Sequence, residues 1–129
     1  MKNVLLVDTN FSSFPIYNYL VDSGYNVFVV GRDPEDFLAR SAPNYVQLDY
    51  SDIDALGQLE EKLDIDVVLP GCNDHSYQAC AALMAGRATG LDAADTTRSL
   101  FDKGQFRKLC DELRLPAPKR VDPAAGGLP

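Results

Sequence analysis

Short apolar runs alternate with helical repeats of apolar residues along the first 94 positions of the chain. Continuous apolar runs that contain β-branched residues predict four strands, at residues 4–7, 25–30, 45–48 and 67–69. Runs of this kind, rather than an apolar-polar alternation, are typical of strands that are covered on both faces. A helical pattern follows each run. The chain therefore predicts an α/β fold, a Rossmann-like doubly wound parallel sheet with helices on both faces.

Polar residues at the predicted helix starts suit the role of caps. The candidates are Ser12 or Ser13 for the first helix, Ser51 with Asp54 for the third, and Asn73 or Asp74 for the fourth. A short helix is expected over residues 34–39. Residues 88–92 are expected to add a short fifth strand, so the sheet has four to five strands.

The pattern becomes purely helical after residue 94. Thr96 or Thr97 is the expected cap, and Gly104 is expected to divide the segment into two short helices. From residue 116 onward, proline and glycine exclude regular structure. We therefore expect a Rossmann-like domain at residues 1–94, a helical segment at 95–115, and a Pro/Gly-rich linker at 116–129, which together make a helical, Pro-rich C-terminal exit.

Composition narrows the class of protein. The net charge of −7 over 129 residues argues against nucleic acid as a partner, and no apolar run is long enough for a membrane span. Three cysteines without a CxxC pair indicate neither a disulfide framework nor a zinc site, and we expect a cytoplasmic protein. Charge is uneven: residues 98–129 hold seven Lys and Arg against four Asp and Glu, whereas the remainder is strongly acidic.

A Rossmann-like sheet suggests two ligand-binding families that the residues do not support. Dinucleotide binding needs a glycine-rich turn after the first strand, but this loop has no glycine and carries Phe11 instead, although Arg32 and Asp33 follow the second strand. A receiver-type signalling domain would use Asp8 and Asp49. Its second acidic residue beside Asp8 is missing, so this alternative rests on fold analogy.

No residue is assigned as a catalyst. His75, the only histidine, is expected to be solvated in the first turn of a helix. Cys72 has no evident base that would activate it as a nucleophile.

The segment from Asp102 to Pro118 favours a different family. Its order, Asp102-Lys103, a short helix, then a small residue before Pro118, resembles the entry into an ATP-grasp fold. The polar Pro-Gly loop after the fourth strand and the short βα unit at the start fit the same family. The whole chain is thus similar to the N-terminal (pre-ATP-grasp) domain of an ATP-grasp ligase, as in the carbamoyl-phosphate synthase large subunit and biotin carboxylase.

The resemblance implies specific residue roles. Lys103 matches the lysine that contacts ATP phosphates, and its flexible ammonium suits that task. The loops after the first and fourth strands would hold a small carboxylate or amino-acid-like substrate, through the following residues: Thr9, Asn10, Phe11, Gly71, Cys72, Asn73 and Asp74. Asn73 and Asp74 are equally well explained as helix caps.

The resemblance also implies an activity and its cofactors. The full-length protein would join a carboxylate to an amine with ATP and Mg²⁺. Its ATP-grasp domains are expected to lie beyond residue 129, and residues 1–129 alone should be inactive and bind no cofactor tightly. The alternative is a stand-alone Rossmann-like module that binds a small ligand. Pairing of two sheets across an edge, giving a homodimer, stays open.

Overall fold

The computed structural model describes residues 1–87 and 89–118 of the chain. These residues form two compact units, one from Met1 to Thr97 and one that begins at Arg98. The helices and strands are β1 (Asn3–Val7), η1 (Phe11–Ser13), α1 (Phe14–Asp22), β2 (Asn26–Gly31), α2 (Phe37–Ser41), β3 (Tyr45–Gln47), α3 (Ile53–Lys62), β4 (Val67–Pro70), α4 (Asp74–Leu83), α5 (Ala94–Phe101) and α6 (Lys103–Glu112). None of the helices in this described part is long and apolar enough to cross a bilayer.

The four strands form one parallel sheet in the order β3-β2-β1-β4. β1 lies at its centre, with Val4 aligned to Val27 of β2 and to Val67 of β4. Every strand but the first is reached through a helix, as parallel pairing requires. The predicted Rossmann-like α/β fold is confirmed.

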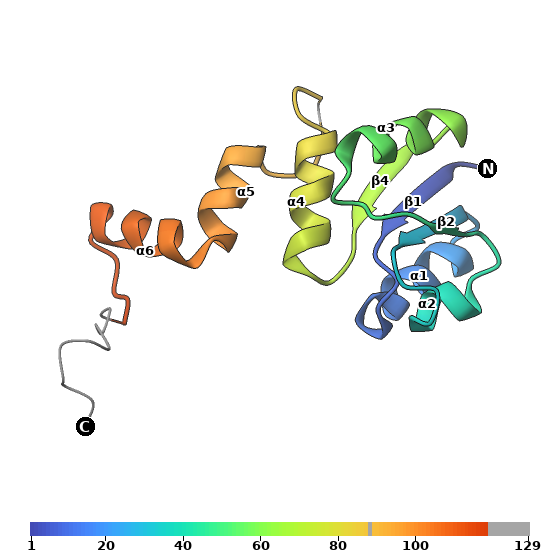
Figure 1. Cartoon of the computed structure of the whole chain (residues 1–129), viewed down its shortest axis with the longest axis horizontal. Helices are drawn as coiled ribbons and strands as arrows, with labels where there is room; N and C mark the ends of the chain where they lie inside the picture. The colour runs from blue at the N-terminus through green and yellow to red at the C-terminus, as the bar shows by residue number, and fades with distance from the viewer. Residues whose placement is uncertain (88, 119–129) are drawn as a thin grey trace. The chain divides into compact units, whose positions relative to one another are not determined.

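Helices cover both faces of the sheet, and alternate residues of β1 decide which core each side chain joins. Val4 and Leu6 of β1 pack with Leu20 of α1 and Leu38 of α2 on one face. Leu5 and Val7 pack on the other face, with α3 and α4. Figure 1 shows α3 and α4 beside β4, and α1 and α2 below β1 and β2. Both faces of β1 are therefore apolar, which explains its continuous hydrophobic run.

Several local predictions are confirmed. Pro15 lies in the first turn of α1, where its missing N–H removes no hydrogen bond. Gly24 follows the end of α1 with a φ of +82°, a conformation that favours glycine. Asn73 is the N-cap of α4, because its side chain accepts a hydrogen bond from the Ser76 amide.

Other local predictions are wrong. The cap of α3 is Asp52 rather than Ser51, because the Asp52 carboxylate accepts from Ala55 N. Ser51 instead donates to Asp49. Ser13 precedes α1 but makes no side-chain cap bond; its hydroxyl is used elsewhere. α2 begins at Phe37, three residues after the predicted start at Pro34.

The C-terminal half also differs from the expected pattern. Residues 89–92 form no strand, so the described part of the sheet has four strands. α5 begins at Ala94, which places Thr96 and Thr97 inside the helix rather than at its cap. Two short helices are present as predicted, but the break falls at Asp102, the N-cap of α6, and Gly104 lies within α6. The tail after residue 118, including most of the predicted linker, falls outside the described residues.

Candidate functional site

A polar pocket of about 450 Å³ opens at the carboxyl edge of the sheet in the first unit. This edge, beside a point where the strand order reverses, is where open α/β sheets bind ligands. The pocket is lined by residues that follow β1, β2 and β3 and by one residue of α4: Asp8, Thr9, Asn10, Arg32, Asp33, Asp36, Asp49, Tyr50, Ser51 and His75. Four carboxylates and one guanidinium make it polar and predominantly acidic.

Asp8, the first residue after β1, is buried and fixed by its neighbours. Its Oδ1 accepts from the Asn10 backbone amide (3.2 Å) and side-chain amide (2.8 Å), and its Oδ2 accepts from Ser13 Oγ (2.5 Å). The Ser13 oxygen in turn accepts from Cys72 N at 2.9 Å. Ser13 therefore ties the loop after β1 to the loop after β4, and Asp8 organises the site more than it offers a free carboxylate.

Two glycines allow the strand ends to approach each other closely. A Cβ atom added to Gly71 would lie 2.1 Å from Asp8 Cβ, and one added to Gly31 would lie 2.2 Å from Thr9 Oγ1. Distances this short are not tolerated, so both positions exclude a side chain. The structure therefore shows a packing role for Gly71. Its role in substrate binding stays a prediction.

Thr9 joins the loops after β1 and β2. Its side chain is buried (2% exposed), and its Oγ1 donates to Asp36 Oδ2 at 2.7 Å. The Thr9 carbonyl oxygen also accepts from Leu38 N at 2.9 Å. These bonds hold Asp36 at the wall of the pocket.

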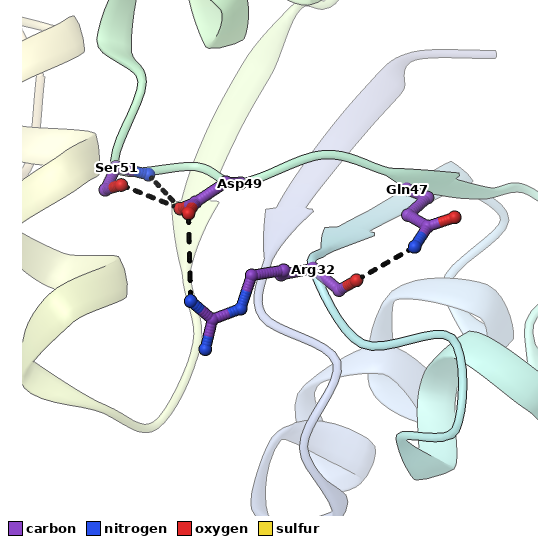
Figure 2. Close-up of polar contacts among 4 residues, drawn as sticks. All are labelled: Arg32, Gln47, Asp49 and Ser51. Carbon is purple, nitrogen blue, oxygen red and sulfur yellow. Dashed lines mark hydrogen bonds and ion pairs between the residues drawn. The ribbon is translucent and has the colours of Figure 1, made fainter.

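The outer wall carries an exposed ion pair between the ends of β2 and β3. Arg32 Nη1 lies 3.8 Å from Asp49 Oδ2, and both side chains are largely solvent-exposed. Figure 2 shows Arg32 reaching toward Asp49, which Ser51 holds through its backbone amide (3.0 Å) and its hydroxyl (2.7 Å). Gln47 donates to the Arg32 carbonyl oxygen.

These bonds set the charge state of the outer wall. The Ser51 hydroxyl, then its backbone amide, lower the pKa of the Asp49 carboxyl below its usual value. Asp49 is thus an anion at neutral pH. The Arg32 guanidinium is 83% exposed and makes a long, weak pair, so it is accessible to a ligand.

Tyr50 and His75 complete the lining. Burial raises the pKa of the Tyr50 phenol, the Asn73 amide opposes this, and the negative charges of Asp8, Asp36 and Asp49 add to it. The phenol is therefore protonated at neutral pH and can donate a hydrogen bond. His75 is exposed in the first turn of α4.

The structure brings together only part of the predicted substrate set. Thr9, Asn10 and the neighbouring His75 line the pocket. Phe11, which follows Asn10 in the sequence, lies on the surface and is 67% exposed. The loop residues Gly71, Cys72, Asn73 and Asp74 do not line it; Asn73 caps α4 and Cys72 is exposed. Their roles in substrate binding stay predictions.

Lys103 belongs to the second unit. It is exposed at the first position of α6, directly after the Asp102 cap. An exposed ammonium at a helix start is compatible with a phosphate ligand. Among residues 1–87 and 89–118, no three His, Cys, Asp or Glu side chains are grouped to hold a metal ion, so no Mg²⁺ ligand is assigned here.

Sequence reasoning missed Asp36, Tyr50 and Ser51 as pocket residues, and it considered Asp49 only for the receiver-type alternative. Each lies in the few residues after β2 or β3, so the rule that ligands meet parallel strands at their carboxyl ends could have found them. The predicted substrate set was drawn only from the loops after β1 and β4, so it left out the residues that follow β2 and β3.

No protein-family model matches the sequence, and no curated protein matches it significantly. Solved structures do match its fold. Phosphoribosylglycinamide synthetase from Anaerococcus prevotii matches 88% of the chain (TM-score 0.72, 14% identity), and glycinamide-RNase-transformylase T from Mycobacterium tuberculosis matches 92% (TM-score 0.72, 23% identity). The biotin carboxylase domain of a single-chain bacterial carboxylase matches 95% (TM-score 0.61, 22% identity).

The chain spans about a third of the length of these structures: the matched parts are 29%, 37% and 31% of their chains. At identities this low the likeness concerns the fold. It agrees with the Rossmann-like fold that the resemblance implies.

Proposed function

We propose that this chain, which has the fold of the N-terminal part of ATP-grasp enzymes, is the substrate-binding part of an ATP-dependent carboxylate-amine ligase. The observation that carries the proposal is the pocket at the carboxyl edge of the sheet, formed on a fold that matches these enzymes over about nine-tenths of the chain. Within this class we propose a ligase similar to the carbamoyl-phosphate synthase large subunit.

The chemistry of the pocket suits an amino-acid-like substrate. Arg32 can pair with a carboxylate of the ligand, because its contact with Asp49 is long and exposed. Asp33 and Asp36 also line the pocket and can accept hydrogen bonds from an ammonium group. The Tyr50 hydroxyl adds a neutral donor. A ligand that carries both charges therefore fits better than a simple anion, which four carboxylates would repel.

The reaction itself needs groups outside residues 1–129. In the full-length protein, ATP with Mg²⁺ would supply the phosphoryl group that activates the carboxylate for attack by an amine. Lys103 would hold a phosphate of the nucleotide, and the pocket would orient the substrate. The partners of this chain would accordingly be the ATP-grasp domains of its own protein and the small substrate.

The direct test is ligase activity of the full-length protein. ADP release in the presence of ATP, Mg²⁺ and a panel of amino acids should depend on the amino acid. Lys103→Ala should lower this activity by at least about tenfold through loss of a charged contact, whereas Lys108→Ala, on the same helix, should not.

Residues 1–129 alone should show no ATP hydrolysis, and micromolar affinity of these residues for ATP would contradict the proposal. A coding sequence that continues into a strand with Val/Ile-Lys-Pro and a Gly/Ser-rich loop would support it.

A second candidate is a stand-alone module that binds a small ligand. It is favoured by one observation: every residue that lines the pocket lies between Asp8 and His75, so the first unit supplies the whole described site. Ligand binding without any amino-acid-dependent ADP release by the full-length protein would select this candidate.

A further inference from the structure

Three phenylalanine rings form a surface cluster in the first unit. Phe11 stacks on Phe14 (centroids 6.3 Å apart, planes at 17°), and Phe37 meets both edge to face, at 5.0 Å from Phe11 and 5.1 Å from Phe14. Phe14 packs partly into the core. Phe11 and Phe37 remain 67% and 42% exposed. The cluster is thus anchored at one ring and open to solvent at two.

The hydrogen bonds that shape the polar pocket also assemble this cluster. Thr9 Oγ1 bonds to Asp36, and the Thr9 carbonyl oxygen bonds to Leu38 N. These two bonds hold the segment that contains Phe37 against the loop that contains Phe11. Phe11 directly follows Asn10, and Phe37 directly follows Asp36, and both of those residues line the pocket. Each exposed ring thus belongs to the residue directly after a pocket-lining residue, although neither ring is itself part of the lining.

Exposure of these rings carries an energetic cost that the fold does not require. Neither Phe11 nor Phe37 packs into the hydrophobic cores on the two faces of the sheet. A phenylalanine ring that stays exposed forgoes the stabilisation that its burial would provide. Two such residues held in contact beside a polar pocket offer flat apolar surface to a ligand whose polar end is already bound.

We propose that Phe11 and Phe37 form a side-chain subsite that selects an aromatic amino-acid-like ligand. This inference rests on the proposed function, since it assumes that the charged end of an amino-acid-like substrate occupies the pocket. The aromatic side chain of the ligand then packs against the two exposed rings. Phe14 supports the two rings from the core side. The subsite determines specificity and takes no part in the chemistry.

The charge of the pocket supports this choice of ligand over other apolar partners. Asp33 and Asp36 favour a ligand with an ammonium group close to its apolar part, and Arg32 favours a carboxylate. An aromatic amino acid carries all three features within a few bonds. The aromatic faces add attraction for the ammonium itself.

The test is an NMR chemical-shift titration of the 129-residue chain with L-phenylalanine, L-leucine and L-alanine. L-Phenylalanine should bind at least about fivefold more tightly than L-alanine, as expected for one aromatic contact, with L-leucine between them. Phe11→Ala should remove most of this preference, so that L-phenylalanine and L-alanine bind with similar affinity. Phe11→Tyr should retain the preference. Tyr19→Ala removes an equally exposed aromatic residue of α1 outside the cluster and should change neither affinity.

The outcomes separate this inference from the proposed function. Equal affinity for the three amino acids, or an equal effect of Phe11→Ala on all three, would overturn the aromatic subsite and leave the proposed function standing. A concentration-dependent dimer in sedimentation that Phe11→Ala dissociates would also overturn it, because the rings would then serve a second copy. Binding of none of the three would reject the proposed substrate class, and the subsite with it.

Discussion

Gly71 lies directly against Asp8, and the two residues leave no room for a side chain between the ends of β4 and β1. A Cβ atom on Gly71 would stand 2.1 Å from Asp8 Cβ and 2.6 Å from Ser13 Oγ. The Asp8 side chain cannot yield easily, because it is buried and accepts three hydrogen bonds. The contact therefore fixes the spacing of the two loops.

Gly71→Ala should destabilise the protein by about 1–3 kcal/mol, because the added methyl group overpacks a fixed site. Urea unfolding followed by circular dichroism measures the change. Gly90→Ala is the matched control, since a Cβ atom there meets nothing within 4 Å and should change stability by less than about 0.5 kcal/mol. Equal effects of the two substitutions would show that the Asp8 contact is not limiting.

Ser13→Ala should cost about 1–3 kcal/mol, because it leaves a buried Asp8 oxygen and the Cys72 amide without their shared partner. Ser12→Ala, at an exposed neighbouring position, should have little effect. Amide hydrogen exchange offers a second measurement: the Cys72 N–H should exchange faster in Ser13→Ala. Unchanged exchange at Cys72 would argue against the bridge.

Thr9→Val should cost about 1–2 kcal/mol, because the isosteric methyl group cannot donate to the Asp36 carboxylate. Thr9→Ser keeps the donor and should recover most of this loss in thermal unfolding. Because the same bond positions Asp36, Thr9→Val should also weaken amino-acid binding more than Thr9→Ser does.

Arg32→Ala should weaken amino-acid binding while leaving the free energy of unfolding nearly unchanged. The pair with Asp49 is exposed and 3.8 Å long, so its loss should change the free energy of unfolding by less than about 0.5 kcal/mol. Binding of an amino acid should nevertheless weaken, since Arg32 is the only Lys or Arg among the described residues lining the pocket. Arg40→Ala removes another exposed pair, with Glu35, outside the pocket and serves as the control. Unchanged amino-acid affinity in Arg32→Ala would remove Arg32 from the proposed site.

The three cysteines should differ in reactivity at pH 8. Cys72 is exposed, whereas Cys80 and Cys110 are buried. A disulfide reagent should therefore modify one thiol rapidly in the folded protein, and Cys72→Ser should abolish the fast phase. A fast phase that persists in Cys72→Ser would show that a buried thiol becomes accessible.

Stability should fall at alkaline pH. Burial raises the pKa of the Cys80 thiol from 9.0 to about 12, so the folded state retains a proton that the unfolded state loses. The resulting stabilisation is fully present below pH 9.0 and declines as the pH rises toward 12. Urea unfolding between these limits should show the decline, and Cys80→Ala should reduce its slope. A residual slope is expected, because burial also raises the pKa of Tyr45 and Tyr50.

The strands and the site's location were predictable because they depend on local pattern. Leu5 and Leu6 point to opposite faces that are both buried, so β1 reads as a continuous apolar run. Asn73 caps α4 through a bond to Ser76, three residues away. Such short-range interactions can be predicted from the sequence alone. The carboxyl edge of a parallel sheet is likewise a general ligand position.

The remaining parts of the site depend on contacts between distant residues. Asp36 reaches the pocket through a bond to Thr9, which lies 27 residues earlier. Ser51 and Asp52 are both good capping residues, and the choice between them follows from the bond that Asp49 makes to Ser51. Residues 89–92, which belong to the predicted fifth strand, pair with no strand in the described structure. The position of Asp36 is therefore decided by a partner distant in the sequence, whereas the cap of α3 is decided by a choice between two neighbouring local bonds.

The central position of β1 also constrains the order in which the chain can fold. Its pairing with β2 closes a short segment, whereas its pairing with β4 brings together Asn3 and Asp66, which are 63 residues apart. Because closing a longer segment costs more chain entropy, β4 should dock last. The wall formed by Thr9, Arg32 and Asp36 should therefore assemble before β4 docks on β1.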